Sequence, residues 1–244
     1  MRLGKNSGII SRRVKMAELD YVKNNYLSLV EEIDRLGEEA GRKITLVAVT
    51  KSGSDDELVA LAAAGVTDIG ENRPNELRRR GDLLRDGGYT PRLHEIGNLQ
   101  RNKVKLIIEG VDLIHSLDSL ALAEEIDKQA TKIGRRIPVL IEINSGREEQ
   151  KGGIMPEDAE AFYLKVRELK GLEVRGLMTM GPVCDDAEEL RPYFRETKTL
   201  FDRLNRCHGF SGGGILSMGM SDSYRVAIQE GSTLVRVGRK LFNR

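Results

Sequence analysis

The alternation of short β-type runs with helical segments is the feature of this sequence that most constrains its fold. Eight runs rich in apolar and β-branched residues recur along the chain, and they predict strands over residues 44–51, 67–71, 92–96, 113–116, 138–144, 174–180, 215–218 and 234–237. Parallel strands need long crossover connections, so this alternation predicts an α/β fold with a parallel sheet. A single (β/α)₈ barrel fits the chain length best, and an open doubly wound sheet is the alternative.

Local signals place helices between these strands. Ser54 and Glu57 predict a capping box at the start of one helix, and Gly65 marks its end. Pro156 suits the first position of another. Further helices are predicted through Leu77 and Leu84, over 99–108, up to 133, and over 156–171, 188–207 and 222–230.

The segment before Lys43 has a helical pattern of its own. Its apolar residues recur at three- and four-residue spacings, namely Leu19, Val22, Tyr26, Leu29, Ile33 and Leu36. This predicts an extra amphipathic helix against the outside or the base of the barrel. We therefore expect one domain over residues 1–244, with a helical extension over 1–43 and the barrel over 44–244.

Charge narrows the classes of function. The chain has 39 Lys and Arg against 38 Asp and Glu, a formal net charge of +1, so it lacks the basic excess typical of nucleic-acid-binding proteins. Arg78, Arg79 and Arg80 form a local basic run. Because Asp82 and Asp86 follow at once, we interpret the run as a solvated helix face rather than a polyanion site.

Hydropathy predicts a cytoplasmic protein without membrane contact. No apolar run approaches the roughly 18 residues needed to span a bilayer. The N-terminus lacks the apolar core of a signal peptide, because Ile9 and Ile10 are followed by Ser11, Arg12 and Arg13.

Cysteines and histidines predict no metal site. Cys184 and Cys207 match no zinc or redox spacing and fit a reducing compartment. His94, His115 and His208 form no ligand-spaced cluster.

Barrel enzymes and binding proteins place their sites at the carboxyl ends of the strands. The polar residues predicted there are Lys51, Glu71, Asn72, His94, Ser116, Asn144, Thr179, Ser217 and Arg236. Asn72 suits either a ligand hydroxyl or a turn. His94, alone on its strand, is more typical of a structural group.

Lys51 ends the first predicted strand. If its side chain points inward, Val47 and Val49 do so too, because side chains alternate along a strand. A lysine with apolar neighbours is partly desolvated, and its amine is then free to attack a carbonyl. The alternative is a lysine that extends into solvent.

The last two predicted strands add features of a phosphate site. Gly219 allows close approach of a backbone, and the helix predicted from Asp222 offers N–H groups to an anion. On the eighth strand, Arg236 lies opposite the apolar face of Val235 and Val237 and should point into the barrel. A phosphate with a nearby aldehyde would satisfy both Arg236 and Lys51; the alternative pairs Arg236 with an inward carboxylate, Glu71 or Glu142.

At these residues the sequence resembles the YggS/PROSC family of pyridoxal 5′-phosphate homeostasis proteins. The matching segments occur in the expected order: AVTK (48–51), GENRPNEL (70–77), HEIGNLQRNK (94–103), IHSLDS (114–119), GLMTMG (176–181), LSMGMSDSYRVAIQEGST (216–233) and VRVG (235–238). The departures are Thr50 and Ser52 around Lys51, Asn98 in place of a frequent His, and Glu142 in place of a common Gln.

The resemblance implies a single barrel similar to the N-terminal domain of alanine racemase, the fold type III of pyridoxal-phosphate proteins. It implies that Lys51 holds the cofactor as a Schiff base and that Asn72 and Thr179 border the ring. It further implies a phosphate or ring pocket formed by Ser217, Met218, Gly219, Arg236, Val237 and Gly238.

Three functions are compatible with these residues. The first is a reversible carrier of pyridoxal phosphate in vitamin B6 homeostasis, a monomer that hands the cofactor to apo-enzymes. The second is a racemase-like enzyme. We favour the carrier, because the racemases take their second base from a C-terminal domain, and here the chain ends at Arg244, just past the eighth strand. The third is a barrel that binds another phosphorylated metabolite without a covalent bond.

Overall fold

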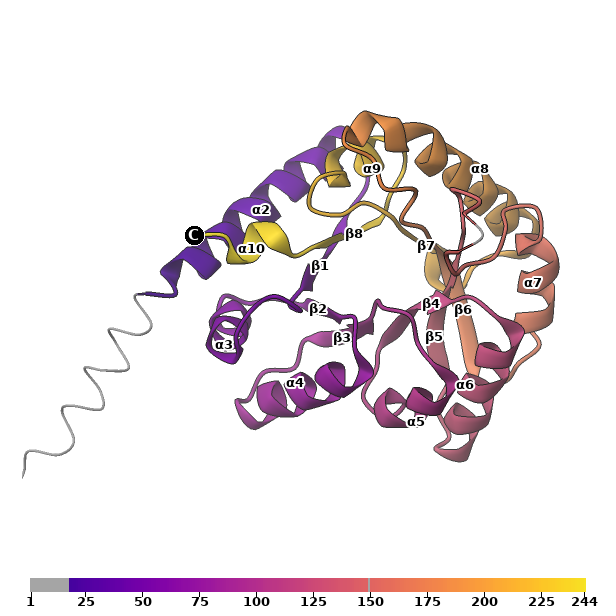
Figure 1. Ribbon diagram of the computed structural model, residues 1–244, viewed down its shortest axis with the longest axis horizontal. Helices are drawn as coiled ribbons and strands as arrows, with labels where there is room; N and C mark the ends of the chain where they lie inside the picture. The colour runs from indigo at the N-terminus through magenta and orange to yellow at the C-terminus, as the bar shows by residue number, and fades with distance from the viewer. Residues whose placement is uncertain (1–17, 149) are drawn as a thin grey trace, which may run out of the picture.

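Eight parallel strands form a closed barrel in the computed structural model, which describes residues 18–148 and 150–244 (Figure 1). The strands follow one another around the barrel in chain order: β1 (Thr45–Val49), β2 (Asp68–Glu71), β3 (Arg92–Glu95), β4 (Leu113–Leu117), β5 (Ile137–Glu142), β6 (Leu172–Met178), β7 (Ile215–Ser217) and β8 (Leu234–Val237). Closure comes from β8, which pairs with β1 so that Val47 lies opposite Arg236. The predicted barrel is confirmed, and the open sheet is excluded.

Helices cover the outside of this barrel (Figure 1). They are α2 (Asp20–Glu39), α3 (Asp55–Ala63), α4 (Pro74–Asp86), α5 (Val104–Ile107), α6 (Leu120–Lys132), α7 (Ala159–Val166), α8 (Arg191–His208), α9 (Tyr224–Gln229) and α10 (Arg239–Phe242), with short 3₁₀ turns η1 (Arg101–Lys103), η2 (Ala187–Leu190) and η3 (Ser211–Gly213). The predicted capping box is confirmed at α3, where Ser54 and Glu57 each bond the other's backbone N–H.

Side-chain alternation divides the apolar residues into two groups. Outward-facing strand residues such as Ala48, Ile69 and Ile114 belong to the large core between the barrel and its helices. A smaller cluster belongs to the inward-facing positions, namely Val47, Leu113, Leu140, Met178 and Leu234. The remaining inward positions are free to carry the polar groups described below.

The predicted N-terminal helix is present as α2. Its buried residues are those of the predicted apolar stripe, Val22, Tyr26, Leu29, Ile33 and Leu36. The helix packs against α3, α9 and α10, and the Asn25 side chain donates hydrogen bonds to the carbonyls of Leu241 and Asn243. The sequence around Ile9 and Ile10, read as lacking a signal peptide, lies outside the described residues. Within the described ranges, no helix is both long enough and apolar enough to cross a membrane.

Four α-helices begin later than predicted. Two follow a 3₁₀ turn: the helix expected over 99–108 is η1 followed by α5 from Val104, and the one expected over 188–207 is η2 followed by α8 from Arg191. The helix expected from Pro156 starts at Ala159, because the chain before it forms a loop in which Ile154 bridges to Ile143 and the Asn144 amide bonds the backbone of Glu148. The helix expected from Asp222 starts at Tyr224, after a turn closed by Met220.

Candidate functional site

Lys51 lies in a tight turn at the carboxyl end of β1. The strand ends at Val49, so the prediction that it extends through Lys51 was wrong; the N–H of Gly53 bonds the carbonyl of Thr50 at 2.9 Å and closes the turn. Lys51 is exposed. Val47 faces the barrel interior, and Lys51 lies two residues past the end of the same strand.

The buried side chain of Arg80 stabilises this turn. Its guanidinium donates hydrogen bonds to the carbonyls of Thr50 and Gly53, the latter at 2.7 Å. It also pairs with the buried carboxylate of Glu71 at 2.8 Å, which accepts a further hydrogen bond from the Thr50 hydroxyl. The prediction of a solvated arginine run was therefore wrong for Arg80. It holds for Arg79, which is half exposed.

Arg236 points into the barrel, as predicted. Its guanidinium is buried and donates hydrogen bonds to the Ser217 hydroxyl and, at 3.1 Å, to the carbonyl of Thr179. Burial lowers its pKa to about 10, against a smaller opposing effect of Glu142. Glu71, one predicted partner, is turned outward to Arg80 instead.

No carboxylate of the described residues lies within ion-pair distance of Arg236, in contrast to the predicted alternative of an Arg236 ion pair with Glu71 or Glu142. Glu142 acts on it only through space; burial, with a smaller effect of Asp118, raises the pKa of Glu142 to about 7. Within the described residues, the site thus offers a buried cation that is not paired with a carboxylate.

Two glycines let the loops after β7 and β8 pack closely against α9 and the end of β1. Gly219 has a φ of +95°, and a Cβ there would lie 2.5 Å from the Cβ of Ala227. A Cβ at Gly238 would lie 2.9 Å from the carbonyl oxygen of Val49. The N–H of Gly238 donates to the Ser221 hydroxyl at 3.3 Å. Neither position can therefore carry a side chain without displacing its neighbours.

Two N–H groups at the start of the helix expected to bind an anion are already engaged within the protein. α9 has six residues, and the N–H groups of Ser223 and Tyr224 both donate to the carbonyl of Met220.

The remaining predicted site residues fall into two environments. Thr179 is buried beside Arg236, with its hydroxyl donating to the carbonyl of Ile143 at 2.9 Å. Asn72 is half-buried at the end of β2, where its backbone lies so close to Gly97 that a Cβ there would be 2.3 Å from the Asn72 carbonyl oxygen. The side chains of Met218 and Val237, by contrast, belong to the outer core.

Two histidines that the sequence separated are in contact. The rings of His94 and His115 bond each other at 2.9 Å, and His94 also bonds the carboxylate of Asp68 at 2.9 Å. The spacing of the two histidines in the sequence could not predict this contact. Their inward-facing positions on the neighbouring strands β3 and β4 could have predicted it. Within the described part of the chain, no group of three metal-ligating side chains is gathered as a metal site.

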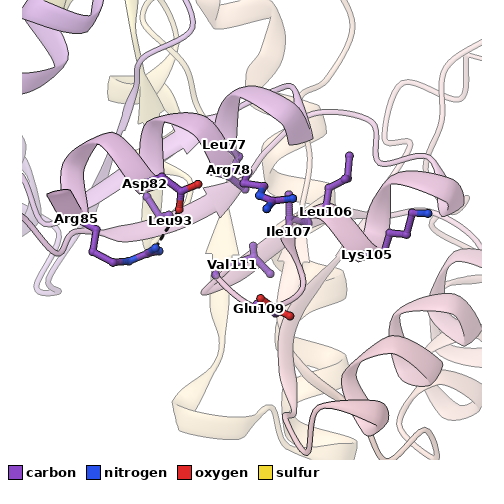
Figure 2. Close-up of a pocket in the computed structure, with 12 residues that line it drawn as sticks. Leu77, Arg78, Asp82, Arg85, Leu93, Lys105, Leu106, Ile107, Glu109 and Val111 are labelled. Carbon is purple, nitrogen blue, oxygen red and sulfur yellow. Dashed lines mark hydrogen bonds and ion pairs between the residues drawn. The ribbon is translucent and has the colours of Figure 1, made fainter.

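A hollow of about 420 Å³ on the barrel's flank contains none of the predicted site residues. It lies between α4 and α5, where Arg85 pairs with Asp82 and Leu93 and Val111 form part of the wall (Figure 2). It is separate from the barrel mouth.

Comparisons with known proteins agree with the family that the sequence resembles. Residues 25–243 match the family model of the alanine racemase N-terminal domain. The pyridoxal phosphate homeostasis protein of Aquifex aeolicus is 40% identical over 217 residues, 88% of this chain and 94% of that protein.

Solved structures are similar over nearly the whole chain. PipY of Synechococcus elongatus, solved with pyridoxal phosphate bound, has a TM-score of 0.79 and 30% identity, covering 91% of this chain and all of its own. An alanine racemase of Clostridium difficile shares the fold, with a TM-score of 0.70 and 20% identity over 92% of this chain and 56% of its own. The predicted resemblance is confirmed: the chain belongs to the pyridoxal phosphate homeostasis protein family, within the group that shares the alanine racemase N-terminal domain.

Proposed function

We propose that this protein binds pyridoxal 5′-phosphate at the barrel mouth, with the cofactor held as an imine on Lys51, and serves intracellular vitamin B6 homeostasis. One observation carries the proposal: Arg236 is buried beside Ser217 and Thr179 with no carboxylate partner among the described residues. A buried cation of this kind is suited to an anionic ligand.

The residues present fit this cofactor. The aldehyde of pyridoxal phosphate condenses with an amine, and Lys51 lies at the end of β1, the strand that pairs with β8. Gly219 and Gly238 let the loops after β7 and β8 pack closely against α9 and the end of β1, since a Cβ at either would clash. Asn72, Thr179 and Ser217 would border the ring and phosphate with polar groups, and Met218 and Val237 would contribute main chain.

The relatives support a carrier rather than an enzyme. This chain spans 94% of the Aquifex protein named for pyridoxal phosphate homeostasis, but 56% of the racemase chain. Racemisation needs a base on each face of the substrate Cα, and Lys51 supplies one. If Arg236 faces the pyridine nitrogen, its charge opposes protonation of that nitrogen and weakens the cofactor as an electron sink.

Three finer points belong to the same proposal. The carrier acts as a monomer and passes the cofactor to apo-enzymes. It works in the cytoplasm, where its free cysteines Cys184 and Cys207 would stay reduced.

Borohydride reduction followed by peptide mapping tests the covalent bond. Protein incubated with pyridoxal phosphate should gain a visible absorption band, and reduction should fix the label on Lys51. Lys51→Ala should lose the band. Lys43→Ala, which removes an exposed lysine at the other end of β1, should keep it.

Two results would overturn the proposal. Saturated protein that carries no label on Lys51 would point to a ligand held without a covalent bond. Cofactor-dependent interconversion of alanine enantiomers that is lost in Lys51→Ala would establish a racemase instead.

A further inference from the structure

We infer that Asp68, His94 and His115 are positioning residues: with Ser217 they form a hydrogen-bond relay through the barrel interior that orients Arg236 toward the ligand. The inference deepens the proposed function and rests on it. None of the three lies in the segments proposed to contact pyridoxal phosphate at the mouth.

The relay is continuous from the base of the barrel to the mouth. Asp68 begins β2, and one of its oxygens lies 2.9 Å from His94 Nε2. His94 Nδ1 is 2.9 Å from His115 Nε2, and His115 Nδ1 is 3.0 Å from the Ser217 hydroxyl. Arg236 then donates to that hydroxyl. All five side chains are buried.

With both imidazole rings in their neutral form, the two ends fix the direction of every hydrogen bond between them. A guanidinium can only donate, so Ser217 accepts from Arg236 and its own proton is directed to His115 Nδ1. The carboxylate of Asp68 can only accept, so His94 must carry its proton on Nε2 and accept on Nδ1. His115 therefore also carries its proton on Nε2. Each neutral ring has one donor and one acceptor, and both are satisfied.

The charges around the relay favour this arrangement. Although burial raises the pKa of Asp68, hydrogen bonds from His94, Arg92 and Thr67 lower it to about 2, so the carboxylate stays ionised. Burial lowers the pKa of His115 well below its usual value, with smaller effects of His94 and Arg236, so its ring stays neutral.

Other charged groups lie at the two ends of the relay. At the base, a hollow of about 270 Å³ has walls that include Asp68 and His94 together with the charged residues Lys43, Arg92, Asp112 and Arg175. At the mouth end, the charge of Glu142 acts on Arg236 through space.

The consequence for Arg236 is a fixed guanidinium plane. Of its five N–H donors, one bonds Ser217 and one bonds Thr179, which leaves the others for a ligand. Aligned hydrogen bonds polarise one another, so the relay extends the influence of the Asp68 charge to the Arg236 end without placing a carboxylate in the ligand site. This explains how a cation can be held in place there and still be available to an anion.

A pair of substitutions of nearly equal shape separates this role from packing. In His115→Asn, the amide oxygen takes the place of Nδ1 and can accept the Ser217 proton, but the shorter side chain gives up the bond to His94, so this variant keeps only the end of the relay next to Arg236. His115→Leu has no acceptor. We expect roughly 10-fold weaker binding of pyridoxal phosphate in His115→Leu, and a dissociation constant within about 3-fold of wild type in His115→Asn. If the His115→Leu variant binds pyridoxal phosphate as tightly as the His115→Asn variant, the relay is overturned.

His208 provides the matched control. It bonds Glu160 and stacks on Tyr163, outside the relay. His208→Asn and His208→Leu should bind pyridoxal phosphate equally well. A Leu-specific loss at His208 as large as at His115 would show that the effect is not particular to the relay.

Histidine NMR tests the relay without the cofactor. In wild-type protein labelled with ¹⁵N-histidine and free of pyridoxal phosphate, the rings of His94 and His115 should both carry their proton on Nε2 at neutral pH. A proton on Nδ1 of either ring would overturn the inference even if a His115 variant failed to fold. If wild-type protein takes up no pyridoxal phosphate, the proposed function fails, while the NMR result still decides whether the relay exists.

Discussion

At the scale of single residues, Arg80 does more for the site than its place in a basic run suggested. Its guanidinium bonds the carbonyls at both ends of the Thr50–Gly53 turn and the carboxylate of Glu71. Lys51 is the second residue of that turn. The position of the proposed imine lysine therefore depends on a buried ion pair between β2 and α4.

Arg80→Met should destabilise the fold by about 3 kcal/mol, because it leaves Glu71 buried without its cation. Arg79→Met, one residue earlier, removes only exposed ion pairs with Asp55 and Glu76 and should cost at most about 1 kcal/mol. Urea unfolding of both variants measures the difference. Equal losses in the two would contradict the role assigned to Arg80.

At the scale of elements, the loops after β7 and β8 depend on residues without side chains. Gly219 combines a left-handed backbone with a neighbouring helix so close that a Cβ would meet Ala227 and Tyr224. The loop therefore lies directly against the first turn of α9, and its shape is set by that contact as well as by its own backbone.

Gly219→Ala should lower stability by about 3 kcal/mol, the sum of backbone strain and overpacking, and weaken uptake of pyridoxal phosphate. Gly65→Ala is the matched control: its φ is +91°, but nothing lies within 4 Å of the added Cβ. It should show only the backbone cost of about 1 to 2 kcal/mol and unchanged uptake. Thermal melts and absorbance titrations compare the two variants. If Gly65→Ala loses as much stability and uptake as Gly219→Ala, contact of the added Cβ with α9 does not explain the effect.

The elements also show how far the sequence predicts this molecule. Strand positions and the inward direction of Arg236 follow from side-chain alternation, which is a local property, and β8 (Leu234–Val237) matches its predicted bounds. The starts of α7 and α9 do not follow from the sequence, because hydrogen bonds donated by the Asn144 amide and accepted by the Met220 carbonyl hold the preceding loops. Arg80 was misread for a related reason: its partner Glu71 is on another element.

At the scale of the whole molecule, the barrel wall and the barrel interior hold ionisable groups of opposite behaviour. Burial raises the pKa of Glu95, on the outer side of β3, to about 8, despite a hydrogen bond from the Gly97 N–H. Burial keeps His115, inside the barrel, neutral. Global stability should therefore depend on pH in opposite senses for the buried carboxyl group and for the buried histidine.

Between pH 7 and 8 the pKa of Glu95, about 8, makes it the main contributor to the pH dependence, and Glu142, with a pKa of about 7, adds a smaller effect of the same sign. In the unfolded chain the pKa of Glu95 is near 4.5, so above that pH the folded state binds one more proton than the unfolded state, and the free energy of unfolding falls as pH rises toward 8. His115 acts in the opposite sense, since it costs stability only below its unfolded pKa of 6.5. We expect wild-type stability to fall by up to about 1.4 kcal/mol between pH 7 and 8. Glu95→Gln should flatten this slope, and the control Glu38→Gln, on the exposed face of α2, should leave it unchanged. Denaturant unfolding at the two pH values measures the slope in both variants. If the wild-type slope survives in Glu95→Gln, another group causes the pH dependence.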